Sequence, residues 1–372
     1  RKDCADFTHH SILRLLHQFD KTSKHYINPK HPPSDTLLAN AKKTVLGFKY
    51  FPDEPGVDSM CTWTENHYIL FTSAAYLSGQ LYPDEVFTNS GHTGREKMDI
   101  NKKRILKWME IRFRTGFSEW LSHVYYDEDL SPLLSLYDFA EDEEIRMKAA
   151  MIIDLILLDM ALNHFQGVLG CTHGRSYENS KKWATNEATI DIMKLLFGMG
   201  IYSGFDSMSA AAFTLSSYRV PKVLEAIATD QSSTLHNRQR SGFKVENAAR
   251  YDLNYTDLES GMIFYQNEAY LHPLTAALTI DMFDAFNWWE NEFFHEFPPY
   301  KFFLRALKAT GLMEPFARWL EKDICRNMRD EASILTYKTP DYMLSTAQDH
   351  RAGFGGDQQH IWQATLGPDA VC

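Results

Sequence analysis

The sequence lacks the features that mark several large classes of protein. Its 372 residues include five widely spaced cysteines and no Cys-x-x-Cys pair, so no zinc site is predicted. The longest apolar run, residues 149–162, contains Asp154 and Asp159 and is too short to cross a bilayer. Motifs of serine hydrolases, P-loop kinases, dinucleotide-binding folds and zinc peptidases are all missing.

An excess of basic residues is also missing. The formal net charge is -11, which argues against a general nucleic-acid-binding protein but leaves room for an anionic ligand in a locally basic groove. The sequence is 44% hydrophobic and 23% charged, as is usual for a folded globular chain. Aromatic residues reach 13%, and aromatic rings either fill cores or stack on flat and sugar-like ligands.

Helical periodicity dominates the first 330 residues. Asp142 before two glutamates, Pro221, and the glycines at 198 and 200 are typical of helix ends. Amphipathic helices are predicted over 35–47, 65–81, 99–114, 129–139, 142–165, 184–199, 207–217, 219–229, 258–270, 275–289, 301–309 and 312–328.

The composition changes after about residue 330. Segments 333–340, 342–346 and 360–366 have the β-branched and alternating character of strands, with a glycine-rich loop between the last two. We therefore expect a helical domain over 1–330 and, over 331–372, the first strands of a truncated β domain.

Three polar clusters contain candidate site residues. In the first, Trp63 precedes Thr64, a possible helix cap, and then Asn66 and His67 at the start of an apolar helix. An amide and an imidazole there can bind a carboxylate, although both can equally serve local packing. In the second, four residues recur at helical spacing, with Trp120 and Tyr125 beside them: Glu119, Ser122, His123 and Tyr126.

The third cluster is a polar loop with His173, Arg175 and Tyr177, where Arg175 is suited to hold a carboxylate in a bidentate fashion. Trp288, in a Trp-Trp pair, is a candidate for stacking on sugars, although tryptophan is more often buried. The basic stretch 236–240 carries no motif and is expected to be a solvated loop.

Together, these clusters resemble the heparinase II/III-type polysaccharide lyases and their alginate-lyase relatives. The likeness lies in Asn66-His67 on one helix and in a later Gly-x-x-Glu-x-x-Ser-x-x-Tyr pattern from Gly116 to Tyr125. The family usually has Asp where this chain has Thr115 and His where it has Tyr126. The resemblance implies an incomplete (α/α) toroid of antiparallel helix pairs, followed by an antiparallel β-sandwich.

The resemblance further implies β-elimination in glycans that contain uronic acids, without a metal or an organic cofactor. The catalytic residues would then be Asn66, Tyr125, His173 and His360. Residues expected to contact the substrate are Trp63, His67, Glu119, Trp120, His123, Tyr126, Arg175, Tyr177 and Trp288. The implied partner is an acidic polysaccharide or oligosaccharide, the implied location is secreted or periplasmic with a leader that is not present in this chain, and oligomers are possible.

Two other functions stay open. A glycoside hydrolase on the same toroid would use two carboxylates, Glu65 and Glu119, roughly 5–9 Å apart according to its mechanism. A non-catalytic glycan-binding or structural protein would keep the toroid without the chemistry, and the replaced Asp and His keep this alternative open.

Overall fold

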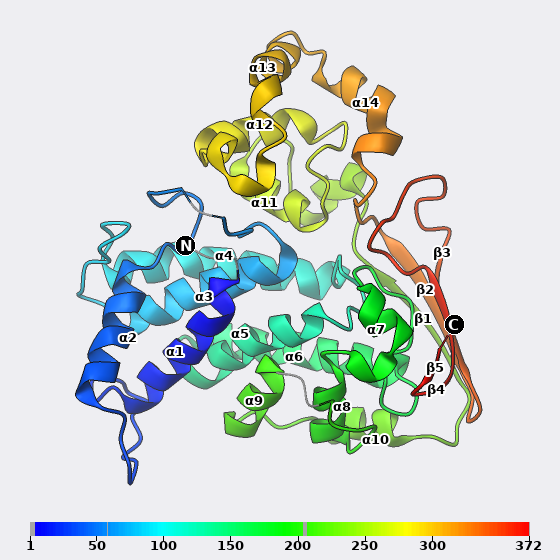
Figure 1. Cartoon of the computed structure of the whole chain (residues 1–372), viewed down its shortest axis with the longest axis horizontal. Coiled ribbons are helices and arrows are strands. Elements are labelled where there is room, and N and C mark those ends of the chain that lie inside the picture. Colours follow the sequence, from blue (N-terminus) through cyan, green and yellow to red (C-terminus); the bar gives the residue numbers. More distant parts are fainter. Residues whose placement is uncertain (1–3, 58, 204–206, 372) are drawn as a thin grey trace.

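The structure is a computed structural model that describes residues 4–57, 59–203 and 207–371. A body of helices lies below a smaller helical lobe, and one antiparallel sheet stands at their side (Figure 1). The chain is mainly α with a β part, as predicted. Within the described ranges, no helix has the length and apolar character needed to cross a membrane.

Among the residues that the structure describes, the helical body comprises ten α-helices and the lobe a further four. The body contains α1 (Ala5–Phe19), α2 (Asp35–Gly47), α3 (Glu65–Leu81), α4 (Gly94–Thr115), α5 (Tyr125–Phe139), α6 (Glu143–Asn163), α7 (Glu178–Lys182), α8 (Ile190–Phe197), α9 (Met208–Leu215) and α10 (Lys222–Thr229). The lobe contains α11 (Leu258–Gln266), α12 (Ala276–Ala285), α13 (Lys301–Ala309) and α14 (Met313–Ile324). Helix α1 was not predicted, and α4 begins earlier than expected.

Local capping explains several of these boundaries. Thr93 and Glu96 form a reciprocal capping box, which starts α4 five residues before the predicted position of 99. Asp142 accepts hydrogen bonds from the next backbone amides and starts α6, as predicted. Gly198 ends α8 in the left-handed conformation, where glycine meets no steric cost.

Helix α3 lies at the centre of the body, and nearly all of its residues are buried. A helix that is buried on every side has no solvated face, and its neighbours must approach it closely. Gly79 of α3 and Gly94 of α4 make this possible, since a Cβ at either position would overlap backbone atoms across the contact.

The β part is one five-stranded antiparallel sheet in the order β1-β2-β3-β4-β5. Its strands are β1 (Leu235–Ser241), β2 (Ala332–Lys338), β3 (Met343–Gln348), β4 (Trp362–Gly367) and β5 (Ala370–Val371). Strand β1 lies before residue 330 and pairs with β2 along its whole length, so the sheet includes a strand from the range predicted as the helical domain. Residues 236–240 were expected to be a solvated loop but form part of β1. Their side chains alternate between partly buried and exposed positions, and the basic residues among them made the strand look like a loop in the sequence.

The sheet packs on the end of α6 and on the loop that follows it. On β2, the buried Thr336 hydroxyl donates to Asn163 Oδ1 over 2.6 Å, and Lys338 Nζ lies 3.3 Å from the His164 carbonyl oxygen. Residues 173 and 360 pair their backbones through two hydrogen bonds of 2.8–2.9 Å. The sheet, the body and the loop 164–177 are thereby fixed relative to one another.

The contact between α3 and α4 generates a stability prediction. Gly79→Ala should lower the free energy of unfolding by about 1–3 kcal/mol, because the new methyl group must displace the Gly94 backbone. Urea denaturation measures this change. Gly47→Ala is the matched control: its Cβ would lie 3.5 Å from Thr88 Oγ1, so stability should stay level or rise by up to about 1 kcal/mol. Equal effects of the two substitutions would contradict the close helix contact.

Candidate functional site

The segment 117–124 between α4 and α5 forms the floor of the candidate site, and it is not helical. Gly116 has φ 73° and lies against Ser241, where a Cβ would come within 2.7 Å of its hydroxyl oxygen. Leu121 is also left-handed, with φ 49°. The expected single helix face for Glu119, His123 and Tyr126 is therefore wrong, because turns at both residues reset the direction of the chain.

The carboxylate of Glu65 fixes this segment to the start of α3. It is fully buried and forms an ion pair with Arg112 of α4. Its oxygens accept hydrogen bonds from the backbone amides of Ser118 (2.9 Å) and Glu119 (2.8 Å) and from the Ser118 hydroxyl (3.0 Å). Ser118 Oγ also lies 2.8 Å from the Gln266 carbonyl oxygen, which belongs to the last residue of α11.

Tyr125, the first residue of α5, stands at the open side of this floor. Its hydroxyl lies 2.6 Å from the hydroxyl of Tyr177, and the Arg175 guanidinium lies 5.3 Å and 5.7 Å from the centroids of the two rings. Burial raises the pKa of Tyr125 above its usual value; the Arg175 charge opposes this rise, and Glu119 and Tyr177 add to it. Tyr125 is therefore a neutral phenol near pH 7.

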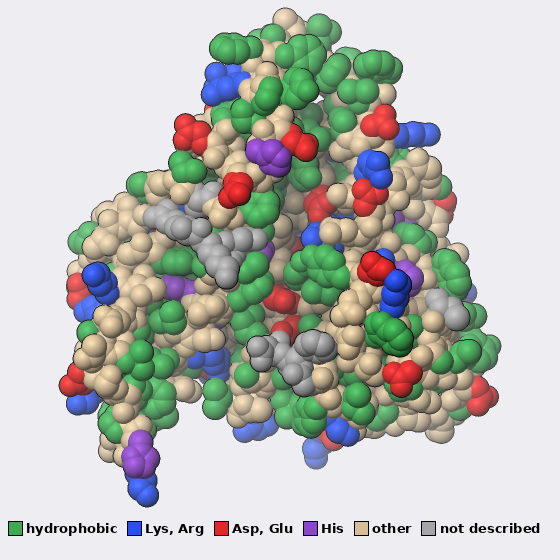
Figure 2. All heavy atoms as spheres, viewed as in Figure 1, with side chains coloured by type: hydrophobic (Ala, Val, Ile, Leu, Met, Phe, Trp, Pro, Cys, Tyr) green, Lys and Arg blue, Asp and Glu red, His purple; other side chains and the backbone are tan. Residues whose placement is uncertain are grey.

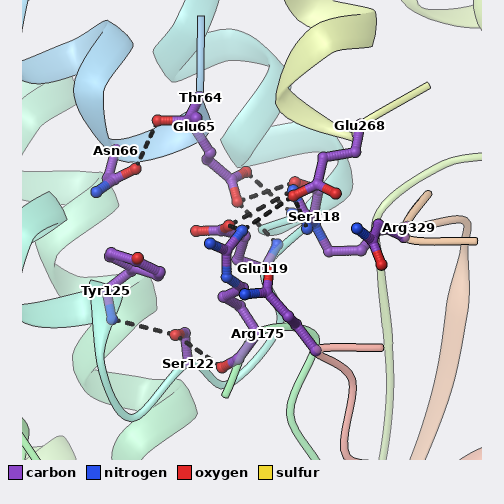
Figure 3. Close-up of polar contacts among 12 residues, drawn as sticks. Thr64, Glu65, Asn66, Ser118, Glu119, Ser122, Tyr125, Arg175, Glu268 and Arg329 are labelled. Atoms are coloured by element: carbon purple, nitrogen blue, oxygen red, sulfur yellow. Dashed lines mark hydrogen bonds and ion pairs between the residues drawn. The ribbon is translucent and has the colours of Figure 1, made fainter. Parts of the chain in front are cut away.

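Two arginines and two glutamates form a compact charge network beside Tyr125 (Figure 3). Oε1 of Glu268 accepts hydrogen bonds from Arg175 Nη1 (2.9 Å) and Arg329 Nη1 (2.8 Å). Glu119 Oε1 lies 3.4 Å from a nitrogen of each arginine. Burial opposes the charge of Arg175, but Glu119, Tyr125 and Glu268 together raise its pKa. The network contains equal numbers of positive and negative side chains.

Asn66 lies on the other side of Glu65 from this network in Figure 3. Its Oδ1 accepts a hydrogen bond from the Thr64 hydroxyl over 2.9 Å, and its buried Nδ2 has no hydrogen-bond partner among the described residues. His67 points elsewhere: its Nδ1 lies 2.7 Å from Asp6 Oδ2 of α1. Burial opposes protonation of His67, but the Asp6 charge and hydrogen bonds raise its pKa well above the usual value. His67 is thus a structural ion-pair partner.

Three histidines from distant parts of the sequence form one cluster, which contacts the segment 117–124 through His173 and the Leu121 carbonyl oxygen. The ring centroids of His123 and His173 are 3.9 Å apart, and those of His173 and His360 are 6.0 Å apart. Burial lowers the pKa of all three, His123 to about 3. His173 is fully buried, whereas His360 is partly exposed. Among the described residues, no group of His, Cys, Asp or Glu is placed to hold a metal ion.

Besides His67 and Glu119, five of the residues expected to contact substrate are buried. Trp63 and Trp288 pack on each other with centroids 5.0 Å apart, so neither offers a free ring face. Trp120 donates its indole N–H to Thr172 Oγ1, and the Tyr126 hydroxyl bonds to both Leu121 and Asp159. These five residues are Trp63, Trp120, His123, Tyr126 and Trp288, each no more than 6% exposed. The apolar area of their rings favours burial more than their polar edges oppose it.

Glu268, Arg329 and Asp6 were missed by the sequence interpretation. Glu268 sits alone after α11, and Arg329 only marked the change in composition, so neither carried a local motif. Ion-pair partners far apart in sequence become visible only once the fold brings them together. Figure 2 shows the hollow between the lobe and the body, with acidic side chains in its depth.

Comparisons with protein-family models, with curated proteins and with solved structures found no match.

The buried Glu65–Arg112 pair generates the second prediction. Glu65→Gln should lower the free energy of unfolding by about 3–5 kcal/mol, because it leaves the buried Arg112 charge without its partner. Chemical denaturation measures the loss. The exposed pair of Glu110 and Arg114 is the control, since Glu110→Gln should cost less than about 1 kcal/mol. A small loss for Glu65→Gln would show that this pair does not hold the floor.

The buried His123 generates a pH prediction. Its pKa is about 3 in the folded protein and 6.5 in a model peptide, so only the unfolded chain takes up a proton as the pH falls below 6.5. The stability that neutral His123 contributes is present above pH 6.5 and is lost as the pH falls toward 3.

In His123→Gln, the loss of unfolding free energy between pH 7 and pH 5 should be smaller than in the wild type by about 2 kcal/mol. Identical pH profiles for the wild type and His123→Gln would contradict the burial of a neutral imidazole.

Proposed function

We propose that the chain is a polysaccharide lyase that cleaves uronate-containing glycans by β-elimination, in a secreted or periplasmic setting. In this proposal, the helical body corresponds to an incomplete (α/α) toroid and the sheet to the β part of that family. The observation that carries the proposal is the contact of the Tyr125 and Tyr177 hydroxyls beside the Arg175 guanidinium. This arrangement places a proton-transfer group next to a group that binds carboxylates.

The chemistry requires both kinds of group. In β-elimination, the C5–H bond of the uronate breaks, its electron pair forms the C4–C5 double bond, and the C4–O bond to the next sugar breaks. Negative charge grows on the carboxyl group while the C5 proton leaves, and hydrogen-bond donors stabilise that charge. A base must take the C5 proton, and an acid must protonate the departing oxygen.

The residues divide these tasks as follows in our proposal. Arg175 binds the carboxyl group, and the buried Nδ2 of Asn66, which has no hydrogen-bond partner among the described residues, is a further candidate donor. Tyr125, a neutral phenol at rest, protonates the departing oxygen, and Tyr177 exchanges protons with it across their 2.6 Å contact. His360 is the candidate for the base, because it is the partly exposed member of its cluster and burial keeps it neutral near pH 7. His173 is fully buried and supports the His360 backbone.

The hydrolase alternative is not favoured by the geometry. Its first carboxylate, Glu65, is fully buried and is occupied by Arg112 and by the amides of Ser118 and Glu119. Glu119 is 2% exposed and lies against two arginines. A catalytic carboxylate pair must reach the glycosidic bond from two sides, and these two carboxylates face structural partners.

The proposal is tested by incubating the protein with a panel of uronate polysaccharides and recording the ultraviolet absorbance of unsaturated uronates. Tyr125→Phe should lower the initial rate by about 10²–10⁴-fold, because it removes the proton-transfer group. The substitution deletes one hydroxyl, so the thermal unfolding midpoint should move little.

Tyr255→Phe is the matched control and should retain full activity, since its hydroxyl donates to the Val245 carbonyl in the lobe. Tyr126→Phe instead probes stability, because its buried hydroxyl holds the segment 117–124. Unchanged turnover in Tyr125→Phe would remove Tyr125 from the mechanism. Binding of the glycans without any unsaturated product would favour the non-catalytic alternative.

A further inference from the structure

Glu268 occupies the position in the site where a carboxylate from outside would be expected to bind. One oxygen of its side chain accepts hydrogen bonds from Arg175 and from Arg329, which come from the loop after α6 and from the segment before β2. Two guanidinium groups that converge on one carboxylate oxygen form a strong, charge-assisted binding site for that group. In the structure, the chain itself supplies the carboxylate.

The backbone conformation of Glu268 is unusual for a glutamate. Glu268 has φ 53°, a left-handed conformation that glutamate rarely adopts and that glycine or asparagine would adopt more readily. It lies in the turn that follows α11, so its carboxylate enters the site from the lobe while both arginines belong to other parts of the fold. Unfavourable backbone conformations of this kind concentrate at ligand-binding positions.

The side chains of Glu268 and Glu119 differ in how firmly they are held beside the two arginines. The Glu119 backbone amide is bound to Glu65, and its side chain is 3% exposed. The Glu268 side chain is 14% exposed and is held only by the two arginines in the contacts that the structure describes. A ligand carboxylate can therefore replace Glu268 without breaking the floor of the site.

We propose that Glu268 is an internal stand-in for the carboxylate of the substrate, and that substrate binding exchanges one carboxylate for the other between Arg175 and Arg329. The inference rests on the proposed function and identifies how that site selects an acidic sugar. The exchange keeps the charge of the arginines balanced throughout, whereas a neutral sugar would leave two buried cations short of a partner. The site thus discriminates against neutral glycans by competition with its own side chain.

The test compares binding of glucuronate and glucose, which differ at this position only in the carboxylate, by isothermal titration calorimetry. Glu268→Gln removes the competing charge at constant size and should bind glucuronate about ten-fold more tightly than the wild type, because less of the protein is in the self-occupied state. Its affinity for glucose should stay unchanged. Glu259→Gln, an exposed carboxylate at the start of α11, is the control and should bind both sugars as the wild type does.

Circular dichroism establishes that each variant is folded. Should Glu268→Gln fail to fold, Glu268→Gly removes the same charge and suits the left-handed backbone, and the same increase in glucuronate affinity is expected. Unchanged or weaker glucuronate binding in the folded variants would overturn the stand-in role.

The outcomes separate this inference from the proposed function. Formation of unsaturated product by the wild type, without tighter glucuronate binding in Glu268→Gln, overturns the stand-in role alone. Tighter glucuronate binding in the variant, with no unsaturated product from any glycan in the panel, overturns the lyase reaction and leaves the carboxylate position supported. Absence of both effects overturns both.

Discussion

The buried carboxylate of Glu65 is the interaction on which the candidate site depends. It begins the central helix α3, pairs with Arg112 of α4 and accepts the backbone amides that fix the segment 117–124. Through Ser118, the same carboxylate is linked to the end of α11 and so to the lobe. A buried charge is tolerated only when its partners are complete, so these parts of the chain must assemble together. The result is a segment 117–124 whose backbone is held firmly in place.

On this floor, three parts of the fold bring their charged groups to one place. The body contributes Glu119 and Arg175, the lobe contributes Glu268, and the segment leading into the sheet contributes Arg329. The balanced charges explain how an acidic protein can hold two arginines side by side. In our proposal, a ligand enters the network at the partly exposed Glu268 and not at the deeply buried Glu119.

The sequence was sufficient for most of the helices, since an amphipathic period or a cap such as Asp142 is a local property. It failed for β1, whose alternating basic residues look like a solvated loop unless their pairing with β2, a strand that begins at Ala332, is known. At the site, motif spacing identified Tyr125, Arg175 and Tyr177, which the fold does bring together. Glu268 and Arg329 were not predicted, because an ion pair between residues 61 positions apart leaves no periodic signal in the sequence. The tryptophans predicted to contact substrate are buried in the core, because tertiary packing decides which aromatic residues are buried.

The most direct test of the central claim is to let the protein cleave a uronate oligosaccharide in ¹⁸O-labelled water and to measure the product masses by mass spectrometry. Elimination only redistributes the atoms of the substrate, so the product masses should sum to the mass of the oligosaccharide, and no heavy oxygen should enter either fragment. Hydrolysis would add one labelled water across the cleaved bond. Label at the new chain end would contradict the roles proposed for Tyr125, Arg175 and their neighbours.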